Sequence, residues 1–228
     1  MDAKNIGVIL AGGVGARLSK EHKKQYIEIN GRECISYVIN AFLDAQSIDA
    51  VLVVENKEQF LEGHVEKKYG LPCAQGGDTR NLSIASGIAY IRQHYPHCEK
   101  VFFHDSARPM IRADIINDIM ALLDTHTGVI TAQPITDGLG CKTNTPADRT
   151  KFYLSQTPEA FRFPVFAQYF DAQSNTVALS HHLPEDADVF HYAGFPYNLK
   201  MTYPEDIYLA ELLLGGHIPQ YLATLPKR

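Results

Sequence analysis

The sequence predicts an α/β fold in which a mainly parallel sheet carries helices on both faces. Short apolar runs alternate with segments of helical periodicity through about residue 132, a pattern typical of parallel sheets. The hydrophobic fraction of 45% and charged fraction of 21% are those of a globular protein. Because 228 residues can bury one large core, we expect a single domain over 1–228.

Four apolar runs are expected to form buried strands, each bounded by glycine or polar residues. They are residues 6–10, 50–54, 101–103 and 128–132. Between them, apolar residues recur three, four and seven positions apart, as on one face of a helix. This periodicity predicts helices within 35–42, 84–91 and 115–123, and a weaker, charged pattern predicts a short surface helix over 62–69.

The alternation breaks at Pro134. Threonines, glycines and β-prone pieces such as 151–154 predict a β-rich excursion from the sheet that runs to about Pro164. Residues 174–184 are polar and are predicted to form a loop, whose two histidines are predicted not to be ligands.

Regular structure is expected again after residue 199. Thr202 and Glu205 have the spacing of a capping box, and Pro204 suits the first turn of a helix. The apolar positions that follow predict a last helix that reaches 214.

The bulk composition excludes several classes of protein. A formal net charge of −5 argues against a broad nucleic-acid-binding face. No apolar run approaches the length of a membrane span, and the N-terminus does not resemble a signal peptide. The four cysteines form no C-x-x-C pair, which predicts reduced thiols and no structural zinc. We therefore expect no nucleic-acid partner, no membrane association and a cytoplasmic location.

A glycine-rich turn follows the first strand, in the stretch 10–18. Three glycines in four positions let backbone N–H groups approach a ligand closely, and Arg17 and Lys24 add two cations, so the turn predicts phosphate binding. Leu18 stands where a third fingerprint glycine would be, and no Gly-Lys-Ser/Thr follows, so the turn is neither a dinucleotide fingerprint nor a Walker loop. An ordinary strand-to-helix turn is the alternative.

Three further polar clusters stand where strands are expected to end, at 76–78, 104–108 and 134–137. Ligands of open parallel sheets bind beyond the carboxyl ends of the strands, so we expect these clusters to converge with the glycine turn. Taken singly, each cluster is also compatible with an ordinary turn. Together they offer cations, carboxylates and a glycine-lined floor, which suit a nucleoside triphosphate with Mg²⁺.

Five motifs that span nearly the whole chain carry a resemblance to a known family. They are Ala11–Arg17 with Lys24-Gln25, Gly76–Arg80 with Ser83, His104–Pro109, Gln156–Pro158, and Asn198–Lys200 with Pro204–Asp206. In this order they resemble the family of 2-C-methyl-D-erythritol 4-phosphate and ribitol 5-phosphate cytidylyltransferases. The resemblance runs from Val8 to about Leu214.

The resemblance implies a Rossmann-like nucleotidyltransferase fold and a reaction of CTP with a polyol phosphate, which gives a CDP-polyol and pyrophosphate. Mg²⁺ is the implied cofactor. The acceptor phosphate attacks the α-phosphorus in line without a covalent enzyme intermediate, so catalysis depends on positioning and on charge neutralisation. The resemblance also implies a homodimer in which a β-arm at about 138–164 contributes to the neighbouring site.

The same resemblance assigns roles to individual residues. The implied nucleotide-binding residues are Ala11, Gly12, Gly13, Gly77, Asp78, Ser83 and Asp105. The implied catalytic cations are Arg17, Lys24 and Lys200. The implied acceptor-binding residues are Arg108, Arg149 and Thr157, and Asp105 is the implied metal ligand.

Simpler structural interpretations stay open for several of these residues. Asp78 also fits an Asx turn, Asp105 fits an ion pair with Arg108, and Arg149 fits an ordinary solvated position. His104 is predicted to be a core residue and not a base.

Two departures bear on the acceptor. Gly138 stands where the family usually has a threonine that contacts the acceptor, and Tyr197 stands where the methylerythritol enzymes typically carry an acidic residue. The sequence over 148–153 also looks more like the ribitol branch, so a ribitol 5-phosphate-like acceptor is favoured. The alternatives are the methylerythritol enzyme of isoprenoid synthesis and, in another class, a non-catalytic nucleotide-binding module.

Overall fold

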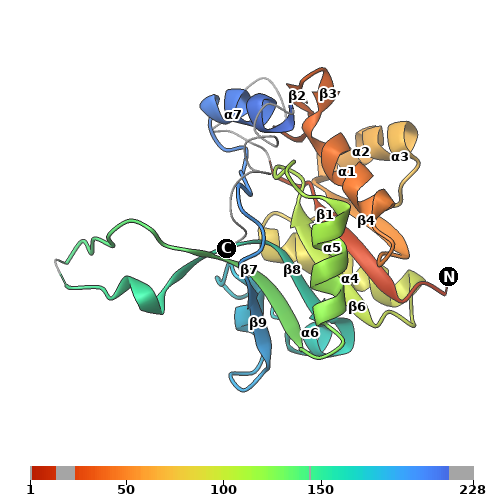
Figure 1. Cartoon of the computed structure of the whole chain (residues 1–228). Helices are drawn as coiled ribbons and strands as arrows, with labels where there is room; N and C mark the ends of the chain where they lie inside the picture. The colour runs from red at the N-terminus through yellow and green to blue at the C-terminus, as the bar shows by residue number, and fades with distance from the viewer. Residues whose placement is uncertain (1, 14–23, 144, 216–228) are drawn as a thin grey trace.

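The structure, a computed structural model, describes residues 2–13, 24–143 and 145–215 (Figure 1). Within these residues the main sheet has seven strands in the order β5-β4-β1-β6-β8-β7-β9. Its strands are β1 (Asn5–Leu10), β4 (Ala50–Glu55), β5 (Cys73–Gln75), β6 (Lys100–Asp105), β7 (Gly128–Pro134), β8 (Tyr153–Arg162) and β9 (Val189–Tyr192). A small second sheet pairs β2 (Glu28–Ile29) with β3 (Arg32–Glu33).

The main sheet is mostly parallel, as predicted. β1 pairs in parallel with both β4 and β6, and β7 pairs in parallel with β9. β8 runs antiparallel to its neighbours β6 and β7. The four predicted strands are all present, whereas the short β5 and β9 were not predicted. The carboxyl ends of β4, β1 and β6 therefore meet at one edge of the sheet.

Helices cover both faces of this sheet. The first face packs against α1, α3 and α5, and the second packs against α4, α6 and η3. The helices are α1 (Cys34–Asp44), α2 (Lys57–Glu62), α3 (His64–Tyr69), α4 (Arg80–His94), α5 (Ala113–Leu122), α6 (Phe163–Tyr169) and α7 (Glu205–Leu214), with short 3₁₀ turns η1 (Lys24–Tyr26), η2 (Arg149–Lys151) and η3 (Leu179–His182). None of the described helices is long and apolar enough to cross a lipid bilayer.

One local prediction was shifted and another was wrong. The predicted surface helix over 62–69 is present as α3 but begins two residues later, because Gly63 adopts a left-handed φ of 62° that ends the unpredicted α2 and precedes α3. The expected capping box of Thr202 and Glu205 does not form. Instead, the Asp206 carboxylate accepts the backbone N–H groups of Thr202 and Tyr203, at 2.7 and 2.8 Å, ahead of α7.

The excursion after β7 is a protruding arm, but it is shorter than predicted. Residues 153–162 belong to β8, whose second half lies inside the main sheet between β6 and β7. The arm is therefore residues 135–152, which project from the body in Figure 1. Its described residues contain the 3₁₀ turn η2 and no strand, so the β character is confined to the β7–β8 pairing at its base.

Candidate active site

A cavity of about 300 Å³ lies beyond the carboxyl ends of β1 and β6, where the sequence placed the ligand. It is lined by Leu10, Gly12, Gly13, Gly77, Asp78, Thr79, Arg80, Ser83, Asp105, Ser106, Ala107 and Lys200. The structure thus brings together six of the seven residues expected to bind the nucleotide. We call this space the nucleotide cavity.

Ala11 is the exception. Its side chain is buried in the hydrophobic core, and its backbone N–H donates to Val54 O at 2.8 Å. Its carbonyl accepts from Gln25 Nε2 at 2.9 Å. Ala11 therefore supports the floor of the cavity and does not line it.

The Gly76-Gly77 turn lets β5 pass directly into the cavity wall. A Cβ atom at Gly77 would lie 2.4 Å from Leu82 Cβ, so a larger residue would displace the start of α4. That start is capped by Thr79, whose hydroxyl accepts the Leu82 N–H at 3.1 Å. Ser83 Oγ donates to Thr79 O at 3.0 Å, which fixes the Ser83 hydroxyl at the wall.

Asp105, the last residue of β6, is the electrostatic centre of the site. Its Oδ2 atom lies 2.8 Å from Lys200 Nζ and 3.5 Å from Arg108 Nε, and its Oδ1 lies 3.9 Å from Arg80 Nη2. Burial opposes ionisation of Asp105, but these three cations outweigh it and hold the pKa of the carboxyl well below its usual range. Asp105 is therefore a fixed carboxylate.

A structural ion pair between Asp105 and Arg108 was left open by the sequence. This pair is present, and it is one of three ion pairs that Asp105 makes with the described residues. The Arg108 side chain is buried, and its Nη1 also donates to Asn198 O at 2.8 Å. Thr157 contacts the backbone of Asp105 from β8, because its hydroxyl accepts the Asp105 N–H at 3.1 Å. Arg108 and Thr157, two expected acceptor residues, therefore flank Asp105.

A second cavity, of about 400 Å³, opens on the far side of Asp105. Its lining includes Arg108 and Thr157, and it shares Arg80, Asp105 and Lys200 with the nucleotide cavity. We call it the adjoining cavity. The shared residues form a charged junction between two spaces that could each hold one reactant.

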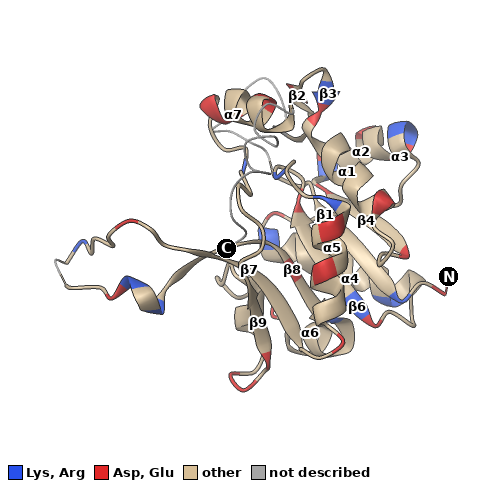
Figure 2. Ribbon diagram, viewed as in Figure 1, with Lys and Arg blue, Asp and Glu red and all other residues tan. Residues whose placement is uncertain are grey.

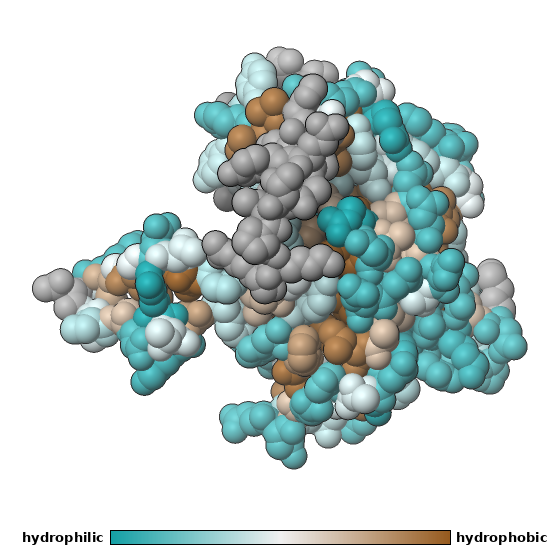
Figure 3. Space-filling model, viewed as in Figure 1, coloured by the Kyte–Doolittle hydropathy of each residue, from teal (hydrophilic) through white to brown (hydrophobic). Residues whose placement is uncertain are grey.

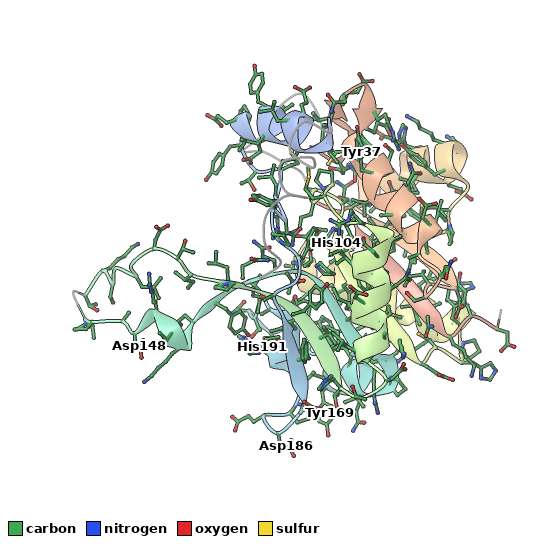
Figure 4. All side chains as sticks on the ribbon, in the orientation of Figure 1. Tyr37, His104, Asp148, Tyr169, Asp186 and His191 are labelled. Atoms are coloured by element: carbon green, nitrogen blue, oxygen red, sulfur yellow. The ribbon has the colours of Figure 1, made fainter. Side chains whose placement is uncertain are left out.

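His104 is a core residue, as predicted. Its side chain is fully buried, and its Nε2 donates to Arg108 O at 3.0 Å. Desolvation lowers the pKa of His104 to about 4, so the ring is neutral at pH 7 and supports the turn that carries Arg108. It lies within the body of the molecule in Figure 4.

The other two predicted catalytic cations are Arg17 and Lys24. Arg17 lies outside the described residues, and Lys24 begins η1. Gln25 ties η1 to the end of β1 through its bond to Ala11 O, and Tyr26 OH donates to Glu55 Oε1 at 2.8 Å at the end of β4. The backbone of Lys24 is thereby anchored beside the carboxyl ends of two strands.

Arg149 does not join the site of its own chain. It is exposed on the arm, and its guanidinium donates to Thr136 O. Figure 4 shows its neighbour Asp148 far out on the arm, and Figure 2 shows the basic residues of η2 there.

The structure places at the cavities two residues to which no role was assigned from the sequence. Arg80 stood inside the Gly76–Arg80 motif but received no role, although it faces both cavities. Glu159, a buried carboxyl in the wall of the adjoining cavity, gave no signal at all because its surroundings come from distant segments.

Asp105 could share a magnesium ion with a nucleotide. Among the described residues no group of three or more His, Cys, Asp or Glu side chains could hold a metal ion by itself. Magnesium at nucleotide sites usually takes one or two carboxylates and phosphate oxygens. Lys200 Nζ pairs with Oδ2 of Asp105, whereas Oδ1 makes the longer contact, of 3.9 Å, to Arg80 Nη2, so Oδ1 suits such shared coordination.

The family model of 2-C-methyl-D-erythritol 4-phosphate cytidylyltransferase matches residues 6–216. The chain belongs to this family. Its cytidylyltransferase class follows from that membership, and the predicted resemblance is confirmed at this level.

Curated relatives agree with this membership. A 2-C-methyl-D-erythritol 4-phosphate cytidylyltransferase of Cereibacter sphaeroides is 30% identical over 225 residues, which cover 91% of this chain and 96% of that protein. The bifunctional ribulose 5-phosphate reductase/CDP-ribitol pyrophosphorylase Bcs1 of Haemophilus influenzae is 29% identical over 230 residues, which cover 92% of this chain. The match spans about half, 48%, of Bcs1.

Solved structures of the family share the fold. The 4-diphosphocytidyl-2C-methyl-D-erythritol synthase of Anaerococcus prevotii superposes with a TM-score of 0.76 at 24% identity, over 93% of this chain and 96% of that one. The enzyme of Thermus thermophilus gives 0.70 at 21% identity, over 91% of this chain and 98% of that one. The predicted nucleotidyltransferase fold is confirmed.

Proposed function

We propose that the protein transfers CMP from CTP to a polyol phosphate that resembles ribitol 5-phosphate. One observation carries the proposal: Asp105, Lys200 and Arg80 form the junction between two cavities. CTP occupies the nucleotide cavity, and the acceptor occupies the adjoining cavity. The two phosphates then meet at the charged junction.

The reaction needs no nucleophile from the protein. A phosphate oxygen of the acceptor attacks the α-phosphorus of CTP, the bond from that phosphorus to the bridging oxygen of the β-phosphate breaks, and pyrophosphate leaves with the electron pair. Lys200 contacts the α-phosphate, while Arg17 and Lys24 hold the triphosphate and its developing charge. Asp105 keeps Lys200 and Arg108 in place through two of its three ion pairs.

Magnesium is the proposed cofactor, held by Asp105 together with phosphate oxygens of CTP. When bound, the ion neutralises phosphate charge and so makes pyrophosphate a better leaving group.

The ribitol-like acceptor is supported by three features. Gly138 lacks the hydroxyl that the methylerythritol enzymes usually offer, and Tyr197 replaces their acidic residue. Tyr197 immediately precedes Asn198, whose Nδ2 donates to Thr157 O at 2.7 Å in the acceptor wall. Bcs1, whose name includes CDP-ribitol pyrophosphorylase, adds a relative with ribitol chemistry. The methylerythritol enzyme is the second candidate, because the other reported relatives carry that name.

A homodimer with shared sites is also proposed. The arm projects away from its own site and carries apolar side chains on its surface (Figure 3). Leu139 and Phe152 are exposed on the arm, and Leu154 is exposed at the start of β8 beside it. Exposed apolar residues on a projecting segment favour burial against a partner. A second copy of the chain would bring Arg149 to the acceptor phosphate of the neighbouring site.

The deciding experiment measures pyrophosphate release with CTP, Mg²⁺ and separate acceptors. The acceptors are ribitol 5-phosphate, 2-C-methyl-D-erythritol 4-phosphate, glycerol 3-phosphate and a pentitol phosphate epimer. The highest kcat/KM is expected with ribitol 5-phosphate. A preference for methylerythritol phosphate would support the second candidate, and CTP binding without turnover of any acceptor would support a non-catalytic module.

A further inference from the structure

The segment that follows α6, residues 171–182, is held against the body by side chains of α4. Arg80 Nη1 donates to Val177 O at 2.9 Å, and Asn81 Nδ2 donates to Thr176 O at 3.1 Å. Both donors belong to the helix whose first turn walls the nucleotide cavity. The path of the 171–182 segment is therefore tied to the site, although the segment itself contains little regular structure.

Glu159 holds the same segment from the sheet. Its Oε2 atom accepts the backbone N–H groups of Leu179 and Ser180, at 2.9 and 3.2 Å, in the first turn of η3. The residue is 2% exposed, and burial raises the pKa of its carboxyl to about 7. Burying a carboxyl group costs free energy, and the bonds that Glu159 makes fix η3 in place.

The anchored segment forms one wall of the adjoining cavity. Thr176 and His181 line the cavity from this segment, and Arg108, Thr157 and Lys200 line it from other elements. Arg80 and Lys200 also line the nucleotide cavity, whereas Thr176 and His181 line the adjoining cavity alone, so cations lie at the junction and a hydroxyl and an imidazole lie outside it. This polarity matches a molecule with a phosphate at one end and hydroxyl groups along a chain.

Resting on the proposed function, we infer that the 171–182 segment is the specificity wall of the acceptor site. The acceptor phosphate lies beside Lys200 and Arg108, and the polyol chain extends from there toward Thr176 and His181. His181 determines specificity by hydrogen bonding to a distal hydroxyl. Glu159 is a positioning residue that acts through η3.

Hydroxyl recognition explains why an imidazole on this wall matters. A neutral imidazole offers one donor and one acceptor, so it can pair with either role of a hydroxyl. Losing that partner leaves the hydroxyl unpaired when the acceptor is bound. A short acceptor that ends before His181 would not be affected.

The neighbouring His182 provides a matched control within η3. Its ring packs on Phe170 with centroids 4.5 Å apart, and its Nδ1 accepts the Asp171 N–H at 3.2 Å. His182 is not part of the lining of the adjoining cavity. Its removal disturbs η3 without removing the proposed contact.

The first test compares wild type, His181→Ala and His182→Ala with the best acceptor of the set and with glycerol 3-phosphate. Glycerol 3-phosphate is measured as a substrate or, without turnover, as a competitive inhibitor. In His181→Ala, kcat/KM for the longer acceptor is expected to fall about tenfold, with the short acceptor and the KM for CTP nearly unchanged. Equal effects on both acceptors, or the same selective loss in His182→Ala, would overturn the inference.

The second test concerns Glu159. Glu159→Ala is expected to raise the acceptor KM about fivefold with little change in the KM for CTP, and Glu159→Gln is expected to restore it, because an amide oxygen still accepts both N–H groups. Equal defects in the two variants would remove the positioning role. Wild-type protein that turns over no acceptor would overturn the proposed function itself, whereas turnover with unselective losses overturns the specificity wall alone.

Discussion

The two halves of the main sheet differ in how they build their part of the site. In the nucleotide half, strands β5, β4, β1 and β6 run in parallel, and short polar motifs directly after strand ends wall the nucleotide cavity. In the acceptor half, strands β8, β7 and β9 with the arm place groups that do not stand at strand ends, such as Glu159 within β8 and the Leu179 N–H of η3. One half is built mainly from motifs at strand ends, and the other from contacts between segments that no strand-end rule brings together.

This difference suggests a division of labour. Under the proposed function, the nucleotide half supplies groups that any acceptor requires, because every reaction of this class must bind CTP and neutralise its phosphates. The acceptor half is then proposed to supply the walls that distinguish one polyol phosphate from another. Substitutions in the first half should therefore reduce turnover with every acceptor, and substitutions in the second should change selectivity.

The largest effect is expected from Lys24→Ala in the nucleotide half. Loss of this cation should lower kcat at least about a hundredfold with all acceptors, about 3 kcal/mol of transition-state stabilisation. Pyrophosphate release at saturating CTP measures it. Lys67→Ala, at an exposed lysine on α3, serves as the charge-matched control. Unchanged turnover in Lys24→Ala would remove the assigned role.

The same division explains what the sequence could predict. The glycine turn and Asp105 stand at the ends of strands whose apolar runs are visible, so their convergence required only the rule for parallel sheets. The Gly76–Asp78 turn was predicted to join them although its strand, β5, was not recognised. The structure confirms these placements, whereas residues 134–137, predicted to converge with them, line neither cavity. It does not test the chemical roles, which stay predictions.

The acceptor half resisted prediction for physical reasons. β9 pairs with β7 over four residues, too short for a recognisable alternation, and β8 begins inside a stretch that resembled a continuous arm. In the sequence, Glu159 resembles an ordinary polar residue of a strand. Only the structure shows that η3 covers its carboxyl group. The pattern of apolar and polar residues along the chain does not reveal such tertiary contacts.

The pH dependence of folding offers a smaller and more specific test of the acceptor half. The pKa of Glu159 is raised in the folded state to about 7, so the folded protein binds more protons than the unfolded chain between its ordinary pKa and pH 7. The contribution of Glu159 to stability therefore falls as pH rises through this range and is constant above it. The expected change is on the order of 3 kcal/mol.

Glu159→Gln isolates this contribution. The free energy of unfolding of this variant, measured by urea denaturation across this pH range, should decrease less with rising pH than that of the wild type. Parallel pH profiles for the two proteins would contradict the raised pKa of Glu159. Activity is not needed for this measurement, so it tests the buried site independently of the acceptor.

Arg149→Ala tests whether the arm completes a neighbouring site. The acceptor kcat/KM is expected to fall about tenfold while the KM for CTP is unchanged, because a charge-assisted contact to phosphate is lost. Lys151→Ala on the same 3₁₀ turn is the control. Mixing Arg149→Ala with Lys200→Ala subunits should restore activity above either variant alone, since one site in the mixed dimer is intact. A strictly monomeric protein in sedimentation would exclude the shared site.

The smallest effect concerns the segment that carries Lys200 into α7. Asp206 accepts the N–H groups of Thr202 and Tyr203, and Met201 N–H donates to Ala107 O at 2.8 Å, so the backbone on both sides of this turn is fixed. Asp206→Ala should lower the free energy of unfolding by about 1 kcal/mol, because two backbone N–H groups lose a charged acceptor near the surface. Glu205→Ala, which removes the cap that the sequence predicted, should cost less than about 0.5 kcal/mol. Urea denaturation of the two variants distinguishes them, and a larger loss in Glu205→Ala would restore the capping box. Because the Asp206 contacts are local and the proposed partner of Lys200 is CTP, any loss of turnover in Asp206→Ala should be equal for all acceptors.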